Sequence, residues 1–149
     1  MLDGDRLRNG LCRGLGFTDA DREENLRRAG EVARLSVESG LDVIAAFITP
    51  RERHRKLIRS IVGESRLSLV HLAATLEVCR KRDTKGLYAG AAAGIVANMT
   101  GFDSLFDEPS QIDLRLDTAR RDVADCLAAL TNFVRQRLRC ERLRDVGDA

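Results

Sequence analysis

Acidic and basic side chains follow the ends of the predicted strands, where they could bind a phosphorylated ligand. Asp3 and Asp5, with Arg8 after them, come directly after the first apolar residues of the chain. A basic run, 51–59, follows the next predicted strand, and Lys85 follows a later one. Open α/β sheets bind ligands at the carboxyl ends of their strands. Two acids among cations suit Mg²⁺ and phosphate esters, because carboxylates bind Mg²⁺ and guanidinium groups bind phosphate.

Each of these features also has a purely structural interpretation. Asp3-Gly4-Asp5 is typical of a turn followed by a helix cap. The run 51–59 could be a solvated face of a helix. The residue types alone leave both interpretations open.

Helices and strands must position these side chains, and the spacing of the apolar residues predicts that the two kinds of element alternate along the chain. Apolar residues at helical spacing predict a helix over residues 19–39, capped by Thr18. The continuous apolar run 42–48 is typical of a buried parallel strand. A basic helix to Val62 comes next, with Gly63 just past its end.

The rest of the chain continues the alternation. We predict strands over 67–72 and 112–116, a short helix over 75–82, and a long amphipathic helix from Val123 onward. The Gly- and Ala-rich stretch 85–101 has no strong period and is interpreted as a mobile, lid-like segment. This order predicts one α/β domain over the 149 residues, with a parallel sheet covered by helices on both faces.

Composition narrows the class of protein. The net charge of +2 gives no argument for nucleic acid or a membrane as partner, and no apolar run is long enough to span a bilayer. The four cysteines form no C-x-x-C pair, so neither a zinc site nor a disulfide framework is predicted. We expect reduced thiols and a cytoplasmic location.

Only Met1 and Leu2 precede the Asp3-Gly4-Asp5 turn, so we expect the first strand to be incomplete in this sequence.

A series of short motifs runs along the chain in a fixed order. They are Leu2-Asp3-Gly4-Asp5 with Arg8, Leu15-Gly16-Phe17, Asp21-Arg22, Glu24-Asn25, Arg27-Arg28, Glu31-Val32-Ala33, Phe47-Ile48-Thr49-Pro50, Leu76-Glu77-Val78-Cys79, Arg82-Asp83, Lys85-Gly86-Leu87-Tyr88, Thr100-Gly101-Phe102-Asp103-Ser104 and Leu116-Asp117-Thr118. In this register, over residues 2–118, the chain resembles the adenylylsulfate (APS) kinase family. The resemblance implies a P-loop-kinase-like fold.

The resemblance also implies an activity. Members of this family transfer the γ-phosphate of ATP, with Mg²⁺, to the 3′-hydroxyl of APS and so make PAPS in sulfate assimilation. It further implies APS and ATP as substrates, a homodimer, and association with sulfate adenylyltransferase.

The resemblance also implies roles for individual residues of these motifs. Asp3 would lie near the Mg²⁺ and the 3′-hydroxyl, as metal ligand or general base. The residues expected to hold the phosphosulfate and ribose of APS are Asp5, Arg8, Arg22 and Asn25. Phe17 would stack on the adenine. As alternatives, Phe17 could be a core residue and Arg22 an ordinary surface residue of a helix.

The remaining expected site residues lie further along the chain. Ile48 and Thr49 would line the APS pocket, and Thr49, where the family has Ser, keeps a hydroxyl that could take part in catalysis. Lys85 and Leu87 would close over the substrate from the lid. Asn98 and Met99 complete the set, with Met99 at a position where the family has an aromatic residue on the second face of the adenine.

Two departures from the family concern ATP. No Gly is followed by Lys anywhere in the 149 residues, so they contain no G-x-x-x-x-G-K-[ST] loop for the ATP phosphates. After Tyr88, where the family has two lysines and then an arginine, the sequence reads Ala89-Gly90-Ala91-Ala92. Two hypotheses remain: an APS kinase whose start lies upstream, or a catalytically inactive remnant that binds APS or pairs with another sulfate-activation protein.

Overall fold

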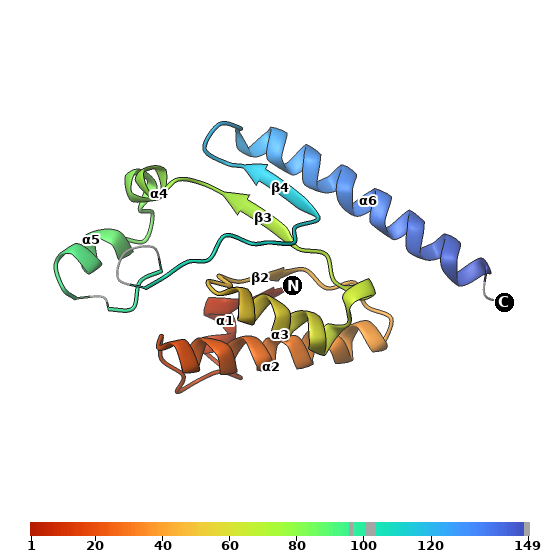
Figure 1. Ribbon diagram of the computed structural model, residues 1–149, viewed down its shortest axis with the longest axis horizontal. Helices are drawn as coiled ribbons and strands as arrows, with labels where there is room; N and C mark the ends of the chain where they lie inside the picture. Colours follow the sequence, from red (N-terminus) through yellow and green to blue (C-terminus); the bar gives the residue numbers. More distant parts are fainter. Residues whose placement is uncertain (96, 101–103, 148–149) are drawn as a thin grey trace. The chain divides into compact units, whose positions relative to one another are not determined.

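The computed structural model describes residues 1–95, 97–100 and 104–147, with side chains up to residue 138. The chain divides into two compact units. Unit 1 comprises Met1–Ser68 and Asp83–Ser110, and unit 2 comprises Leu69–Arg82 and Gln111–Ala149. Figure 1 labels the helices and strands of both units.

Unit 1 is built mainly from helices. Its elements are β1 (Leu2–Asp3), α1 (Gly4–Arg8), α2 (Asp19–Glu38), β2 (Ala45–Ala46), α3 (Glu52–Val62), the 3₁₀ helix η1 (Glu64–Arg66) and α5 (Leu87–Ala92). The helices predicted over 19–39 and up to Val62 are confirmed as α2 and α3. The stretch 85–101 forms one short helix, α5, in its described part; residues 96 and 101–103, including three residues of the Thr100–Ser104 motif, lie outside the described residues.

Local signals fix the ends of the two long helices. Thr18 caps α2, since its hydroxyl oxygen accepts a hydrogen bond from the backbone N–H of Asp21 at 3.2 Å. Gly63 ends α3 with a φ of +100°, a conformation that costs glycine nothing. α2 and α3 pack side by side (Figure 1), and the apolar face of α2 contributes Leu26, Ala29 and Ala33 to the buried core of unit 1.

The predicted strand 42–48 is only partly confirmed. β2 spans Ala45–Ala46 and pairs in parallel with β1, Leu2 opposite Ala45 and Asp3 opposite Ala46. The expectation of burial is wrong for this run: the side chains of Ile44 and Ile48 are 65% and 61% exposed. Alternate side chains of a strand point to opposite faces of its sheet, so the face that carries Ile44 and Ile48 is uncovered, while Val43 and Phe47 on the other face are half-buried.

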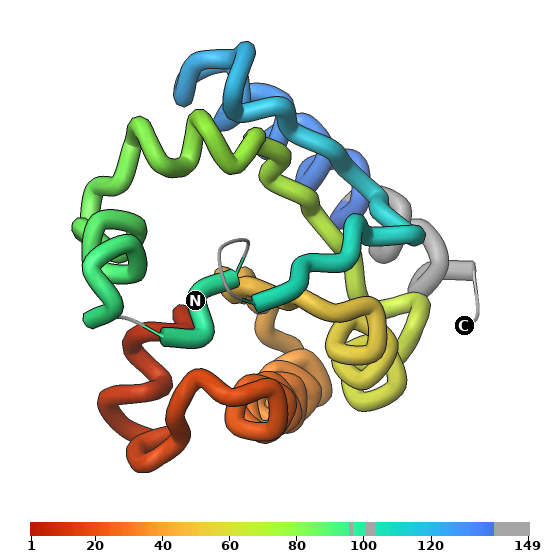
Figure 2. The backbone as a smooth tube through the Cα atoms, turned by 60° about the vertical axis from the view of Figure 1, so that its left-hand side comes forward, coloured from red at the N-terminus to blue at the C-terminus, as the bar shows by residue number. Residues whose placement is uncertain are grey.

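Unit 2 contains a second parallel pair. β3 (Val70–Ala73) pairs with β4 (Leu114–Asp117), while α4 (Leu76–Arg82) and α6 (Val123–Gly147) are its helices. The backbone N–H of Thr118 and its hydroxyl both donate to the Ala73 carbonyl, which fixes the register at the end of the pair. α6 packs against β4 (Figure 2). The predicted strands 67–72 and 112–116 are thus confirmed with shifted ends.

The architecture agrees with the predicted α/β class, since both strand pairs are parallel and helices lie between the strands in sequence. Among the residues that the structure describes, no helix is both long enough and apolar enough to cross a membrane.

Candidate functional site

The turn from β1 into α1 places Asp3 at the start of the site. One oxygen of its carboxylate, Oδ1, accepts hydrogen bonds from the backbone N–H groups of Asp5 and Arg6 at 3.1 and 3.0 Å. Asp3 is therefore the N-cap of α1, as the structural interpretation of the turn predicts. This cap holds the carboxylate at the carboxyl end of a parallel strand, where α/β folds bind ligands.

Two guanidinium groups lie near the aromatic ring of Phe17. The Cζ atoms of Arg8 and Arg22 lie 4.4 and 5.5 Å from the ring centroid. Arg8 Nη1 also donates to the carbonyls of Leu15 and Gly16, and Arg22 Nε donates to the carbonyl of Phe17 at 3.0 Å. The ring is 52% exposed, so the alternative of Phe17 as a core residue is not what the structure shows.

The segment after Asp83 reaches two of the expected site residues. Lys85 Nζ forms an ion pair with Asp5 Oδ2 at 2.5 Å, and Arg22 Nη2 donates to the carbonyl of Asn98 at 2.5 Å. Asn98 has a φ of +59°, in the left-handed region that asparagine tolerates better than most residues. Expected site residues from α1, α2 and the 85–98 segment therefore meet within unit 1.

Asp83 holds the turn that carries Lys85. Its two carboxylate oxygens accept from the backbone N–H groups of Tyr88 and Ala89, at 3.1 and 3.0 Å, at the start of α5. Its carbonyl accepts from the N–H of Gly86. Asp83 of the Arg82-Asp83 motif thus shapes this turn.

The other expected residues stand outside these contacts. Asn25 on α2 is 3% exposed, and its Nδ2 has no hydrogen-bond partner in the described structure. Ile48 and Leu87 are exposed, whereas Thr49 and Met99 are half-buried. A buried amide that lacks a partner costs free energy, so Asn25 is suited to a polar ligand.

Neighbouring charges set the protonation of two side chains near the site. Hydrogen bonds from Arg27 and Arg28 lower the pKa of the Glu24 carboxyl to about 2, so Glu24 stays ionised. The hydrogen bond to Asp5 raises the pKa of Lys85. Lys85 is therefore a cation at every physiological pH.

The basic run after β2 does not form the predicted ring of phosphate-binding cations. Arg53 pairs with Asp19 and Glu23 of α2, Arg51 with Asp107, and Arg59 with Glu64. The guanidinium of Arg55 is buried and bonds to other groups of unit 1. The run is therefore divided: Arg53 and Lys56 lie on the exposed face of α3, as the solvated-face interpretation predicts, whereas Arg55 is buried.

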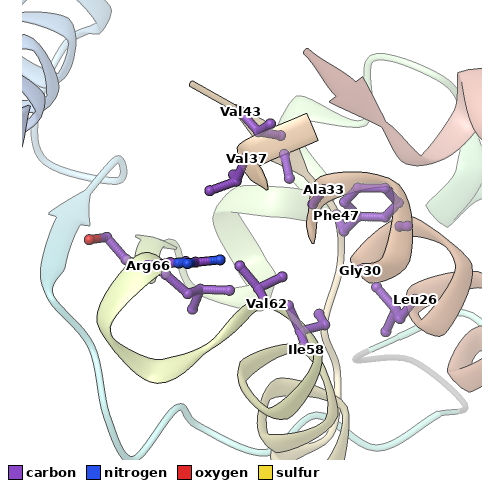
Figure 3. A pocket seen from close by; sticks show the side chains of 13 residues that line it. Leu26, Gly30, Ala33, Val37, Val43, Phe47, Ile58, Val62 and Arg66 are labelled. Atoms are coloured by element: carbon purple, nitrogen blue, oxygen red, sulfur yellow. The ribbon is translucent and has the colours of Figure 1, made fainter. Parts of the chain in front are cut away.

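A cavity of about 150 Å³ lies elsewhere in unit 1 (Figure 3). Side chains of α2, α3 and the segments 43–47 and 66–68 line it, including Leu26, Phe47 and Val62. The lining is mostly apolar, with Arg66 and Ser68 as its polar members, and includes none of the expected site residues. We interpret it as a packing gap in the core rather than a substrate pocket.

The described residues offer an incomplete set of metal ligands. Within ranges 1–95, 97–100 and 104–147, no group of three or more His, Cys, Asp or Glu side chains is placed to hold a metal ion. Mg²⁺ in phosphoryl-transfer sites is often held by one or two carboxylates together with substrate phosphates. Asp3 can supply one such carboxylate.

Comparison with known proteins agrees with the motifs. A family model described as adenylylsulphate kinase matches residues 1–117. The adenylyl-sulfate kinase of Prochlorococcus marinus is 46% identical over 127 residues, and that of Aeromonas hydrophila subsp. hydrophila 47% over 138. These alignments cover 85% and 93% of this chain, and 63% and 70% of the relatives.

A solved structure shows the same fold. The APS kinase of Mycobacterium tuberculosis, solved in complex with AMPPNP and APS, superposes with a TM-score of 0.84 at 39% identity. The match covers 90% of this chain and 78% of that structure. With the P-loop-kinase-like α/β fold and the motif series in register, these matches show that the chain belongs to the adenylylsulfate kinase family.

Proposed function

We propose that this chain is the APS-binding part of an adenylylsulfate kinase, which transfers the γ-phosphate of ATP to the 3′-hydroxyl of APS and makes PAPS for sulfate assimilation. The observation that carries the proposal is the meeting of Arg8, Phe17 and Arg22 with Asn98. An exposed ring with two guanidinium groups beside it suits a ligand with an adenine and an anionic tail. Membership of the family supports the reaction.

We infer the individual roles from the resemblance to the family motifs. Phe17 stacks on the adenine, while Arg8, Arg22 and Lys85 attract the phosphosulfate. Asn25, Ile48, Thr49, Leu87 and Met99 line the rest of the pocket, with Asn98 bound to Arg22. Asp5 orients Lys85 through their ion pair.

Asp3 is the proposed catalytic carboxylate. It accepts the proton of the 3′-hydroxyl as that oxygen attacks the γ-phosphorus and the bond to the β-phosphate oxygen breaks. With the substrate phosphates it would also hold Mg²⁺, which neutralises charge on the transferring phosphate. The Thr49 hydroxyl is proposed to assist at the same end of the pocket.

We further propose a cytoplasmic protein that forms a homodimer and associates with sulfate adenylyltransferase. Conditions that keep thiols reduced suit Cys12, Cys79 and Cys126, which are unpaired in the structure. The family membership supports the other two parts of this proposal.

Isothermal calorimetry on the 149-residue chain tests the proposal. Because the expected APS residues are present and no Gly-Lys pair occurs in the sequence, we expect tighter binding of APS than of ATP. We also expect no measurable PAPS formation by these 149 residues. Tighter binding of ATP, or steady PAPS production, would contradict this assignment.

A second candidate is a catalytically inactive APS-binding protein. It is favoured by α5, whose residues after Tyr88 are Ala89-Gly90-Ala91-Ala92 and carry no cation. The coding DNA upstream of Met1 distinguishes the two. An in-frame strand with a Gly-Lys-Ser/Thr loop supports the kinase, and a stop codon or frameshift supports the inactive form.

A further inference from the structure

We propose that Arg55, together with Asp107, is a positioning residue that fixes the loop carrying Ile48 and Thr49. The expected effect of Arg55 on APS binding rests on the proposed function. Its expected effect on the loop rests on geometry alone. Neither residue is among the motifs that resemble the family. Both belong to unit 1.

The guanidinium of Arg55 is a buried fork with a partner on each nitrogen. The residue is 3% exposed. Its Nη1 donates to the carbonyl of Thr49 at 2.5 Å, its Nη2 to the carbonyl of Asp107 at 2.7 Å, and its Nε to Glu52 Oε2 at 2.8 Å. Because a lysine ammonium is a compact point charge, it cannot reproduce this planar set of contacts.

Asp107 binds the same stretch of chain from the other side. Its backbone N–H donates to the Pro50 carbonyl at 2.7 Å, and its Oδ2 accepts from the N–H of Glu52 at 3.0 Å. Its Oδ1 accepts from Arg51 Nη1 at 3.2 Å. Arg51, the N-cap residue of α3, makes no side-chain cap of its own, so Asp107 caps α3 from 55 residues away.

These contacts lock the loop between β2 and α3 at successive residues. The carbonyl of Thr49 is held by Arg55, the carbonyl of Pro50 by Asp107, and the first N–H of α3 by Asp107 again. Pro50 is fully buried and its ring fixes φ. The Thr49 carbonyl belongs to the peptide plane between Thr49 and Pro50, so the bond from Arg55 holds the backbone directly after Thr49.

The partners of Arg55 also exclude a direct role in catalysis. Its three bonds go to groups of the protein, and its burial keeps it from reaching a phosphate. The structure therefore assigns to Arg55 an effect on APS that acts through Thr49.

Amide hydrogen exchange tests the loop directly and needs no ligand. Arg55→Lys keeps the charge but loses the fork. Within 47–52 we expect the amide of Glu52, which donates to Asp107, to exchange at least tenfold faster because the loop opens locally. Arg53→Lys is the matched control, because Arg53 lies on the same helix and bonds to Asp19 and Glu23 of α2 instead. Exchange within 26–35, beyond the α2 partners of Arg53, should be equal in both variants. Asp107→Ala, at a half-exposed side chain, provides a second test if Arg55→Lys does not fold.

Calorimetry with APS tests the functional consequence. Arg55→Lys should weaken APS binding about tenfold, the loss expected for one misplaced polar contact, and Arg53→Lys should not. Arg55→Lys combined with Thr49→Ala should cost less than the sum of the two single changes, because both act through Thr49. A purely structural role would give additive effects.

The outcomes separate the two proposals. If the unchanged chain binds no APS, the proposed function fails, while faster exchange over 47–52 still supports the positioning of the loop. Unchanged exchange in both Arg55→Lys and Asp107→Ala overturns the inference. If APS binds equally to the unchanged chain and to Arg55→Lys, the inference is also overturned and the proposed function stands.

Discussion

Lys85 and Asp5 form an ion pair across 80 residues of sequence, and both are residues expected to bind APS. The pair joins the turn before α5 to α1. Both side chains are exposed, so the pair contributes little to stability. Its importance is that it holds a cation beside the Asp3 end of the site.

Replacing Lys85 should therefore affect binding and not folding. Lys85→Met removes a cation from the proposed phosphosulfate site, and we expect APS to bind about tenfold more weakly, as for one lost charge-assisted contact. Lys81→Met is the matched control, since Lys81 forms an exposed ion pair with Glu77 on α4. Tyr88, the single tyrosine, gives a fluorescence signal on α5 for the titration. Equal affinity in the two variants would remove Lys85 from the site.

Phe17 offers a test of the adenine position. Its ring is half-exposed, so Phe17→Ala should leave the unfolding midpoint nearly unchanged. Stacking of a base on an aromatic ring contributes about 1–3 kcal/mol, so APS affinity should fall about tenfold or more. Phe17→Tyr should retain binding. Leu11→Ala, a half-exposed apolar residue before Phe17, is the control. If Phe17→Ala binds APS like the unchanged chain, the adenine lies elsewhere.

The helices were predictable because their signals are local. The Thr18 cap, the apolar face of α2 and Gly63 after α3 all act within a few residues of the element that they define. The strand at 42–48 was harder, because burial of its side chains depends on which helices cover the two faces of the sheet. An apolar run indicates that a strand is suited to burial, but it does not indicate whether both faces of the sheet are covered.

The contacts of the basic run could not be predicted from the sequence for the same reason. Arg53 finds its partners on α2, about 30 residues away, and Arg55 binds Asp107 across 52 residues. Nothing in the neighbourhood of either residue in the sequence distinguishes a buried fork from a phosphate ligand. Asp107 itself lies in a segment without periodicity, so no local pattern marked it as the cap of α3.

His54 should make stability depend on pH. It is fully buried on α3, neither ring nitrogen has a hydrogen-bond partner in the described structure, and its Nε2 lies 3.7 Å from Asp19 and 3.8 Å from Glu23. Burial lowers the pKa of His54, with Arg53 and Arg51 acting in the same direction and the two acids opposing it. The folded state thus favours the neutral ring.

The sign of the effect follows from this pKa. The unfolded chain takes up a proton below about pH 6.5, the ordinary histidine value, and the folded chain only at lower pH. The free energy of unfolding should therefore fall as pH drops through 6.5 toward the lowered folded pKa. Urea unfolding at pH 7.5 and 5.5 measures this, and His54→Gln should show a smaller decrease. The same decrease in both proteins would assign the pH dependence to other groups.

The approach of α2 to α3 depends on Gly30. A Cβ atom there would lie 3.3 Å from Cδ1 and 3.4 Å from Cγ2 of Ile61. Alanine is about 1 kcal/mol better than glycine inside a helix, but here the gain is offset by crowding, so we expect Gly30→Ala to be nearly neutral. Gly30→Val adds two further atoms and should destabilise unit 1 by about 1–3 kcal/mol.

The crowding can be measured through its partner. Ile61→Val removes Cδ1, and on its own it should cost about 0.5–1.5 kcal/mol through lost packing. In the Gly30→Ala background the same change relieves the contact, so it should cost less, and the double variant should be more stable than the sum of the single changes predicts. Urea unfolding of the four proteins at one pH gives the coupling energy. Additive changes would mean that α2 and α3 separate freely at this point, and that the close approach of Gly30 to Ile61 is not required for the packing of unit 1.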